Sequence, residues 1–145
     1  MILISHRGNM NGYSGRENSH EQIELALTRG YECEIDVWYD SGIFWLGHDE
    51  PVEKTNEMFL KNVKLWCHAK NNVTLNALLN IKAHCYFHVN DACVLTSRSY
   101  IWTYPGSTLT TRSICVLQGI VLPSDIRIAA GVCSDFIDDI KDKLI

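Results

Sequence analysis

The spacing of apolar and polar residues predicts strands that alternate with helices in the first half of the chain. Ser19 is a good helix N-cap, because Gln22 follows three residues later and completes a capping box. Gly30 is a natural stop for the same helix. The pattern predicts strands over residues 1–5, 31–38, 43–46 and 65–69, and further helices within 50–62 and over 73–81 after a cap at Asn71 or Asn72.

Beyond residue 84 the pattern changes to short apolar runs with little chain between them. Only the C-terminal stretch 135–144 has the length and spacing of another full helix. Strand–helix units are therefore expected first, and strands with abbreviated connections after them, in a single domain spanning residues 1–145. The later strands are predicted near residues 84–89, 93–95, 100–104, 114–117, 120–122 and 131–134.

Composition argues against several classes of protein. The net charge is −4 without runs of like charge, whereas a nucleic-acid-binding face needs a basic patch. No stretch approaches the roughly 20 apolar residues of a membrane-spanning helix, and the N-terminus lacks the basic and apolar regions of a signal peptide. The six cysteines form no CxxC pair and mostly lie in apolar runs. This favours buried, reduced thiols and a cytoplasmic protein over disulfides or a zinc site.

The predicted strand over residues 31–38 is unusual because carboxylates line one of its faces. Side chains alternate along a strand, so Glu32, Glu34 and Asp36 share a face from which Ile35 points away. A solvated surface strand has this pattern, and so does a barrel strand whose acidic face lies at the barrel mouth. Neighbouring carboxylates repel each other unless a cation lies between them.

The residues best suited to chemistry are concentrated before residue 50. His6 follows the first predicted strand and His48 follows a predicted hairpin, so the two imidazoles are candidates for an acid–base pair. Arg7 offers a guanidinium fork for phosphate oxygens, and Lys70 adds a second positive charge. This set suits the cleavage of a phosphodiester. Oxygen ligands of the kind that Mg²⁺ and Ca²⁺ prefer are present on Glu17, Glu34 and Asp36.

The order of these motifs resembles the glycerophosphodiester phosphodiesterases, within the superfamily of phosphatidylinositol-phospholipase-C-like phosphodiesterases. The matching segments are His6-Arg7-Gly8, Glu17-Asn18, Glu34-Ile35-Asp36 and His48-Asp49, with weaker matches at Cys67-His68-Ala69-Lys70 and Gly131-Val132-Cys133-Ser134-Asp135. The resemblance implies a (β/α)8 barrel, which typically needs about 250 residues. For 145 residues the expectation is an α/β fold, a reduced or incomplete TIM-type barrel with several helices missing in the second half. A homodimer would cover the apolar strand faces that such a barrel exposes.

The resemblance also implies an activity. The expected reaction is metal-dependent cleavage of a small, soluble, glycerophosphodiester-like substrate, in which a neighbouring substrate hydroxyl attacks first and gives a cyclic phosphate. His68 stands where the family has a third metal-ligating Glu, and an imidazole suits Mn²⁺ or Zn²⁺ better than Ca²⁺. Two alternatives stay open. One is a non-catalytic module that holds a phosphorylated ligand on the same reduced barrel, and the other is a lyase that stops at the cyclic product.

The remaining histidines and aromatic residues are expected mainly to pack. His84 is expected to be structural, and His20, beside the helix cap, to be exposed. His88 lies at the end of a predicted strand, where packing is favoured and a place in a pocket wall is the alternative. The same two readings apply to the segment Trp102-Thr103-Tyr104.

Overall fold

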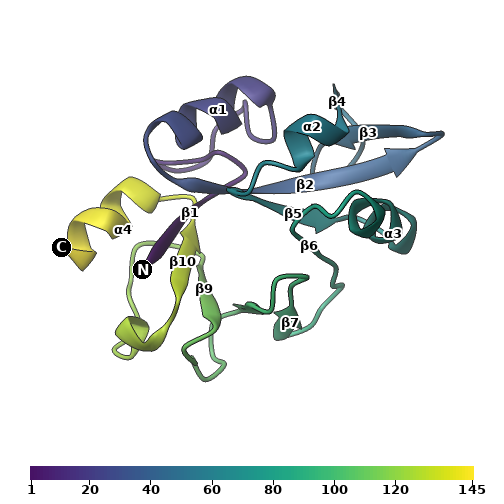
Figure 1. Ribbon diagram of the computed structural model, residues 1–145. Helices are drawn as coiled ribbons and strands as arrows, with labels where there is room; N and C mark the ends of the chain where they lie inside the picture. Colours follow the sequence, from purple (N-terminus) through teal and green to yellow (C-terminus); the bar gives the residue numbers. More distant parts are fainter.

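Ten strands and four α-helices form a curved mixed sheet with helices packed against it in this computed structural model, which describes residues 1–145 (Figure 1). The helices are α1 (His20–Thr28), α2 (Glu57–Leu60), α3 (Asn72–Asn80) and α4 (Ile137–Leu144), with a 3-10 turn η1 (Ile126–Ile128). The strands are β1 (Ile2–His6), β2 (Glu32–Asp40), β3 (Ile43–Leu46), β4 (Glu53–Thr55), β5 (Leu65–Ala69), β6 (Cys85–Tyr86), β7 (Cys93–Leu95), β8 (Ile101–Thr103), β9 (Ser113–Leu117) and β10 (Gly131–Ser134).

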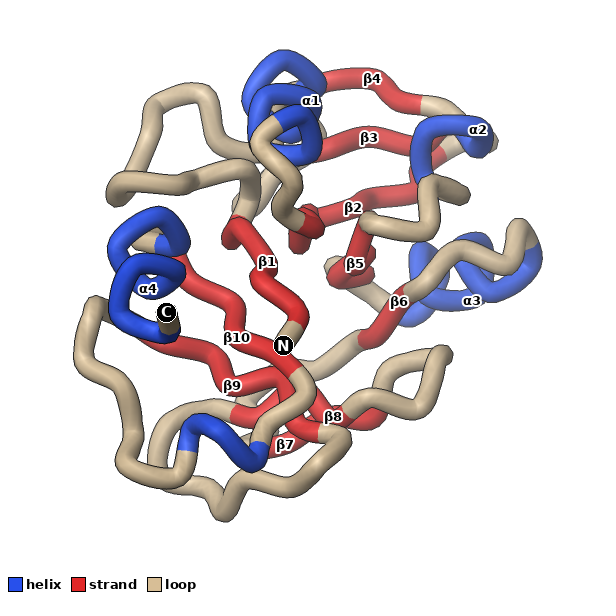
Figure 2. Tube along the Cα trace, turned by 60° about the vertical axis from the view of Figure 1, so that its left-hand side comes forward, coloured by secondary structure: helices blue, strands red, loops and turns tan.

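Strand β2 is the centre of the sheet because its nine residues pair with three neighbours. Its first part lies parallel between β1 and β5, and its end turns back into the antiparallel strand β3. Parallel strands continue in the order β6–β5–β2–β1–β10–β9–β8, and β7 is antiparallel to β8. Figure 2 shows β4, β3, β2, β1, β10 and β9 following one another along the curve.

The helix starts agree with the sequence prediction. Ser19 caps α1 and Asn71 caps α3, each by accepting a hydrogen bond from a backbone N–H three residues later. The Gln22 side chain, however, donates to the backbone oxygen of Gly8 instead of completing a capping box. This bond ties α1 to the loop after β1. Two local predictions are wrong: β4 is an additional strand, and residues 120–122 form none.

Apolar side chains cover both faces of the sheet, as parallel strands require. On the convex face, α1, α2 and α3 cover a cluster around Ile35 and Val37, and α4 covers a second cluster around Val132 and Ile137. The concave face is filled by buried residues from six strands: Ile4, Trp66, Tyr86, Trp102, Ile114 and Cys133. These side chains form the floor beneath the carboxyl ends of the strands.

The expected reduced TIM-type barrel is wrong, because the sheet does not close. Helices account for 23% of the chain and strands for 30%, and no ladder joins β6 to β8. Instead, the Ser97 backbone N–H donates to the Cys85 carbonyl oxygen at 2.8 Å, and the rings of Tyr86 and Trp102 stack with centroids 4.9 Å apart. Another parallel strand would need a crossover of about a dozen residues or more. Six residues separate β6 from β7 and five separate β7 from β8, too few for such a crossover, and β7 lies antiparallel to β8.

The structure agrees with the predicted state of the thiols: all six cysteines are free, and only Cys93 is exposed. None of the helices combines the length with the apolar character that crossing a bilayer demands.

His84 is confirmed as a structural residue, and we predict that its titration destabilises the fold in acid. It is 2% exposed, packs on Trp66 with ring centroids 4.2 Å apart, and hydrogen-bonds through Nε2 to Thr96 at 2.8 Å. Burial, and secondarily the charge of Arg98, lowers the pKa of His84 from 6.5 to about 4. Between pH 6.5 and pH 4, His84 is therefore protonated in the unfolded chain but neutral in the folded chain. The free energy of unfolding falls as the pH drops from 6.5 towards 4.

Denaturant titrations at pH 7 and pH 4.5 measure this effect in the wild type and in His84→Gln, whose amide replaces the hydrogen bond but does not titrate. The wild type should lose about 2 kcal/mol more free energy of unfolding than the variant between the two pH values. An equal loss in both proteins would show that His84 does not contribute to the acid sensitivity.

Candidate active site

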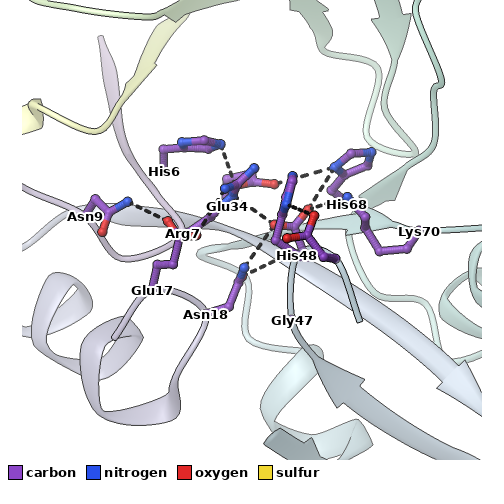
Figure 3. Close-up of polar contacts among 12 residues, drawn as sticks. His6, Arg7, Asn9, Glu17, Asn18, Glu34, Gly47, His48, His68 and Lys70 are labelled. Atoms are coloured by element: carbon purple, nitrogen blue, oxygen red, sulfur yellow. Dashed lines mark hydrogen bonds and ion pairs between the residues drawn. The ribbon is translucent and has the colours of Figure 1, made fainter. Parts of the chain in front are cut away.

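The strand register brings residues that are distant in sequence together at the carboxyl ends of the parallel strands. His6 at the end of β1 lies opposite Glu34 of β2, and Asp36 lies opposite His68 of β5. In open α/β sheets, this end of the strands is where ligands bind. The residues surround a cavity of about 680 Å³. Figure 3 shows His6, Arg7, Glu34, His48 and His68 among the residues that make polar contacts with one another here.

The loop after β1 holds Arg7 in a strained backbone conformation. Its φ is 56°, in the left-handed region that residues other than glycine seldom adopt. Two backbone hydrogen bonds fix it: the Arg7 N–H donates to the Glu34 carbonyl oxygen, and the Asn18 N–H donates to the Arg7 carbonyl oxygen. Strain of this kind persists where the surroundings over-determine the conformation, as at functional sites. Here it directs the guanidinium towards the carboxylates of β2.

His48 is placed by a turn that only glycine allows. Gly47 has a φ of 153°, and a Cβ at this position would lie 2.0 Å from the carbonyl oxygen of Glu50. The turn carries His48 from the end of β3 to the rim of the cavity, where its Nδ1 lies 2.8 Å from a carboxylate oxygen of Asp49. Partial exposure leaves the ring accessible to a ligand in the cavity.

Asp36 is fully buried and is surrounded by cations and donors. Arg7 Nε lies 2.9 Å from Oδ2, an ion pair in which the N–H is not aligned for a hydrogen bond, while the Lys70 ammonium lies 3.2 Å from Oδ1. His68 Nδ1 is 3.1 Å from Oδ1, and the Asn18 amide donates to Oδ2 at 3.0 Å. Burial alone would raise the pKa of Asp36, but the His68 hydrogen bond and the two positive charges outweigh it and hold the pKa well below its usual range.

Glu34 is the less satisfied of the two carboxylates. It is 2% exposed, and its Oε2 has no hydrogen-bond partner. Burial and the charge of Asp36 raise the pKa of Glu34 above its ordinary value. An unpaired carboxylate oxygen in a buried site is costly, so this oxygen is available to a ligand that brings positive charge.

His6 is oriented by Asp135, which sequence reasoning had not singled out. The His6 Nδ1 lies 2.8 Å from the Asp135 carboxylate, which also accepts from the Asn9 amide at 2.8 Å. With the proton on Nδ1, Nε2 points to the side of Glu34, 3.7 Å from Oε2. Burial lowers the pKa of His6, but the Asp135 hydrogen bond and the charges of Glu34 and Asp135 outweigh it and raise the pKa overall. The signal for Asp135 was its position immediately after the apolar run of β10.

The side chains of Glu34, Asp36 and His68 could together hold a metal ion. One ligand atom from each lies within 4.8 Å of the others. Two carboxylates and one imidazole form a mixed oxygen and nitrogen set, which suits Mn²⁺ or Zn²⁺ better than Ca²⁺. The unpartnered Oε2 of Glu34 fits this use. Glu17 stands outside the cluster, where it accepts from Arg7 at 3.2 Å and from the Asn9 amide at 3.1 Å.

The site residues expected from the sequence therefore gather around one cavity, and they differ in whether they line it. Asp36 lies buried behind the lining, and Glu17 supports Arg7 from the side. The others line the cavity directly: His6, Arg7, Glu34, His48, His68 and Lys70. Lys70 and Arg7 both line the cavity and pair with Asp36, so two positive charges lie between this carboxylate and the open space.

Comparisons of this chain with models of protein families, with curated proteins and with solved structures found no match.

If Glu34, Asp36 and His68 hold the metal ion, their side chains should control its affinity and other acidic side chains nearby should not. Replacing His68 by Ala should weaken Mn²⁺ binding at least about tenfold, because it removes a ligand atom. Replacing Glu17 by Gln should change the affinity less than about threefold, because Glu17 contacts Arg7 and Asn9 instead. Calorimetric titration with Mn²⁺ measures both affinities, and thermal unfolding of the metal-free variants checks that each is folded. A larger loss in Glu17→Gln than in His68→Ala would assign the ligands differently.

Proposed function

We propose that this protein is a metal-dependent phosphodiesterase that cleaves a small, glycerophosphodiester-like substrate. The observation that carries the proposal is that His6 and His48 line one cavity with Arg7, Lys70 and the buried carboxylates of β2. Acid–base catalysis of phosphodiester cleavage needs two proton-transfer groups and positive charge at the phosphate, and this cavity contains both. The motif order that resembles the glycerophosphodiester phosphodiesterases supports the same reaction.

The phosphate binds on the side of the cavity that carries the positive charges. The Arg7 guanidinium and the Lys70 ammonium receive its oxygens and stabilise the charge that develops on them. Asp36 pairs with both cations, so it fixes their positions before the substrate arrives. Fixed cations lower the barrier more than mobile ones, because they need no reorganisation during the reaction.

His6 and His48 transfer the protons. One imidazole accepts the proton of a substrate hydroxyl next to the phosphate, and the oxygen of that hydroxyl forms a bond to phosphorus. The bond from phosphorus to the leaving oxygen breaks, and the second imidazole protonates that oxygen. The products of this step are a cyclic phosphate and an alcohol, and water can open the ring by the same proton transfers in reverse.

A divalent metal ion held by Glu34, Asp36 and His68 would supply further positive charge to the phosphate oxygens. Asp135 serves the reaction by holding His6 in one tautomer, so that Nε2 is the atom that exchanges protons. The cavity volume of about 680 Å³ is in the range of ordinary small-molecule sites, which favours a small diester over an extended polymer.

The test is an assay with bis-arylphosphate and glycerophosphodiester substrates in the presence of Mg²⁺, Mn²⁺, Ca²⁺, Zn²⁺ or EDTA. Metal-dependent turnover is expected, and His6→Ala and His48→Ala should each reduce it at least about a hundredfold through the loss of a proton-transfer group. Glu50→Ala is the matched control, because it removes an exposed side chain near His48 that does not line the cavity. Phosphorus NMR of the products separates a hydrolase from a lyase that stops at the cyclic phosphate.

Wild-type activity retained in both histidine variants would refute the assignment. A folded wild type that binds phosphate esters without turning over any diester would instead indicate a phospho-ligand-binding module.

Asp135 has a separate and sharper prediction. Asp135→Asn keeps the size of the side chain, but its amide can donate to Nδ1 and so favours the wrong tautomer of His6. We expect kcat to fall at least about a hundredfold with KM changed less than about threefold, because Asp135 acts on the proton transfer rather than on phosphate binding. Steady-state kinetics measure both constants. A rise in KM at unchanged kcat would place Asp135 in substrate binding instead.

A further inference from the structure

The cavity has a second side whose chemical character differs from that of the carboxylate side. The carboxylates, the ammonium and the guanidinium that line the cavity all belong to β1, β2, β5, β10 or the segments that follow these strands. The other side is built from the chain after β6 and β8 and from the end of β9, on both sides of the gap in the sheet. It carries no carboxylate, ammonium or guanidinium, and it is lined by Phe87, His88, Val89, Tyr104, Val116 and Gln118.

His88, which follows β6, and Tyr104, which follows β8, meet across this side. The Tyr104 hydroxyl oxygen lies 2.7 Å from His88 Nε2, and the two ring centroids are 5.1 Å apart. The His88 ring also stacks on His68, with centroids 4.8 Å apart and planes 5° from parallel. The stacking on His68 and the contact with Tyr104 fix the His88 ring, and the ring in turn fixes the position of the Tyr104 hydroxyl.

The proton positions in this pair follow from burial. His88 Nδ1 is buried without a partner, and a buried N–H without an acceptor is strongly disfavoured. The proton of the ring therefore lies on Nε2, which donates to the Tyr104 oxygen. Burial also raises the pKa of Tyr104 to about 12, so the phenol keeps its own proton. That proton has no acceptor within the protein.

We propose that this side of the cavity is the subsite for the alcohol portion of the substrate, and that the Tyr104 hydroxyl donates its proton to an oxygen of a neutral, hydroxyl-bearing alcohol. The proposal rests on the phosphodiesterase function, because that function places the phosphate at Arg7 and Lys70 on the other side of the same cavity. It adds a specificity-determining residue, Tyr104, and a chemical class of alcohol, an uncharged polyol.

The surroundings argue against an alcohol that carries an ammonium group. No carboxylate lines this side to pair with it, and Lys70 lines the same cavity with a positive charge of its own. An aromatic cage for a quaternary ammonium needs open ring faces. Trp102 and Tyr86 do not offer them, because they are 1% and 2% exposed and stack on each other.

The test measures how tightly three phosphate monoesters bind to the wild-type protein in calorimetry at one fixed metal concentration. Glycerol 3-phosphate and propyl phosphate have the same carbon number and the same charge but differ by two hydroxyls, and phosphocholine carries a quaternary ammonium. Glycerol 3-phosphate should bind about tenfold more tightly than propyl phosphate, because a buried donor gains its acceptor. Phosphocholine should bind more weakly than propyl phosphate.

Tyr104→Phe removes only the hydroxyl and should bring the glycerol 3-phosphate and propyl phosphate affinities within about twofold of each other. Tyr100→Phe is the matched control, because Tyr100 does not line the cavity, and it should keep the tenfold preference. Equal binding of the two esters by the wild type, a preference that survives in Tyr104→Phe, or tightest binding of phosphocholine would each overturn the proposal.

The proposed reaction does not consume monoesters, so binding and turnover are independent readouts. A preference for glycerol 3-phosphate without any phosphodiesterase turnover would count against the proposed function and leave the subsite standing.

Discussion

The buried carboxylate of Asp36 is the group on which the geometry of the site depends. A carboxylate withdrawn from water is stable only when cations and hydrogen-bond donors replace its hydration. Asp36 obtains them from the loop after β1, from Asn18 before α1, and from His68 and Lys70 of β5 and its end. One side chain therefore ties three segments together. Removing it would leave buried cations without a partner, a loss that is typically larger than the net gain from forming the pair.

This arrangement also explains the unequal properties of the two neighbouring carboxylates. Asp36 receives the available cations and stays ionised, whereas Glu34 keeps an unpartnered oxygen and a raised pKa. The two lie two residues apart on the same face of β2, so their repulsion is built into the strand. A strand with such a face gains nothing for folding stability from Glu34. A bound cation would supply the partner that its buried oxygen lacks.

Much of the local structure could be predicted from the sequence, because its causes are local. The caps Ser19 and Asn71, the turn before β3 and the apolar face of β2 follow from residues close to one another in the chain. The site residues before position 50 were recognisable as a set for the same reason. Asp135 stands out in the sequence only as part of a strand segment, since its contact with His6 spans 129 residues. His20 was expected to be exposed, yet it bonds to Glu53 and Thr55 of β4, a strand too short and polar to predict.

The sequence could not show that the sheet stays open, because closing it depends on how much chain remains after the first half has folded. β6 pairs only with β5, and β7 pairs with the side of β8 that faces away from β9, so side chains fill the gap between β6 and β8 in place of a ladder. Tyr86 stacks on Trp102 below, and His88 meets Tyr104 above, at the cavity. A backbone ladder at this place would present its own paired N–H and C=O groups. Side-chain packing presents a free hydroxyl instead, so the shortness of the chain that keeps the sheet open also creates the group proposed to select the substrate.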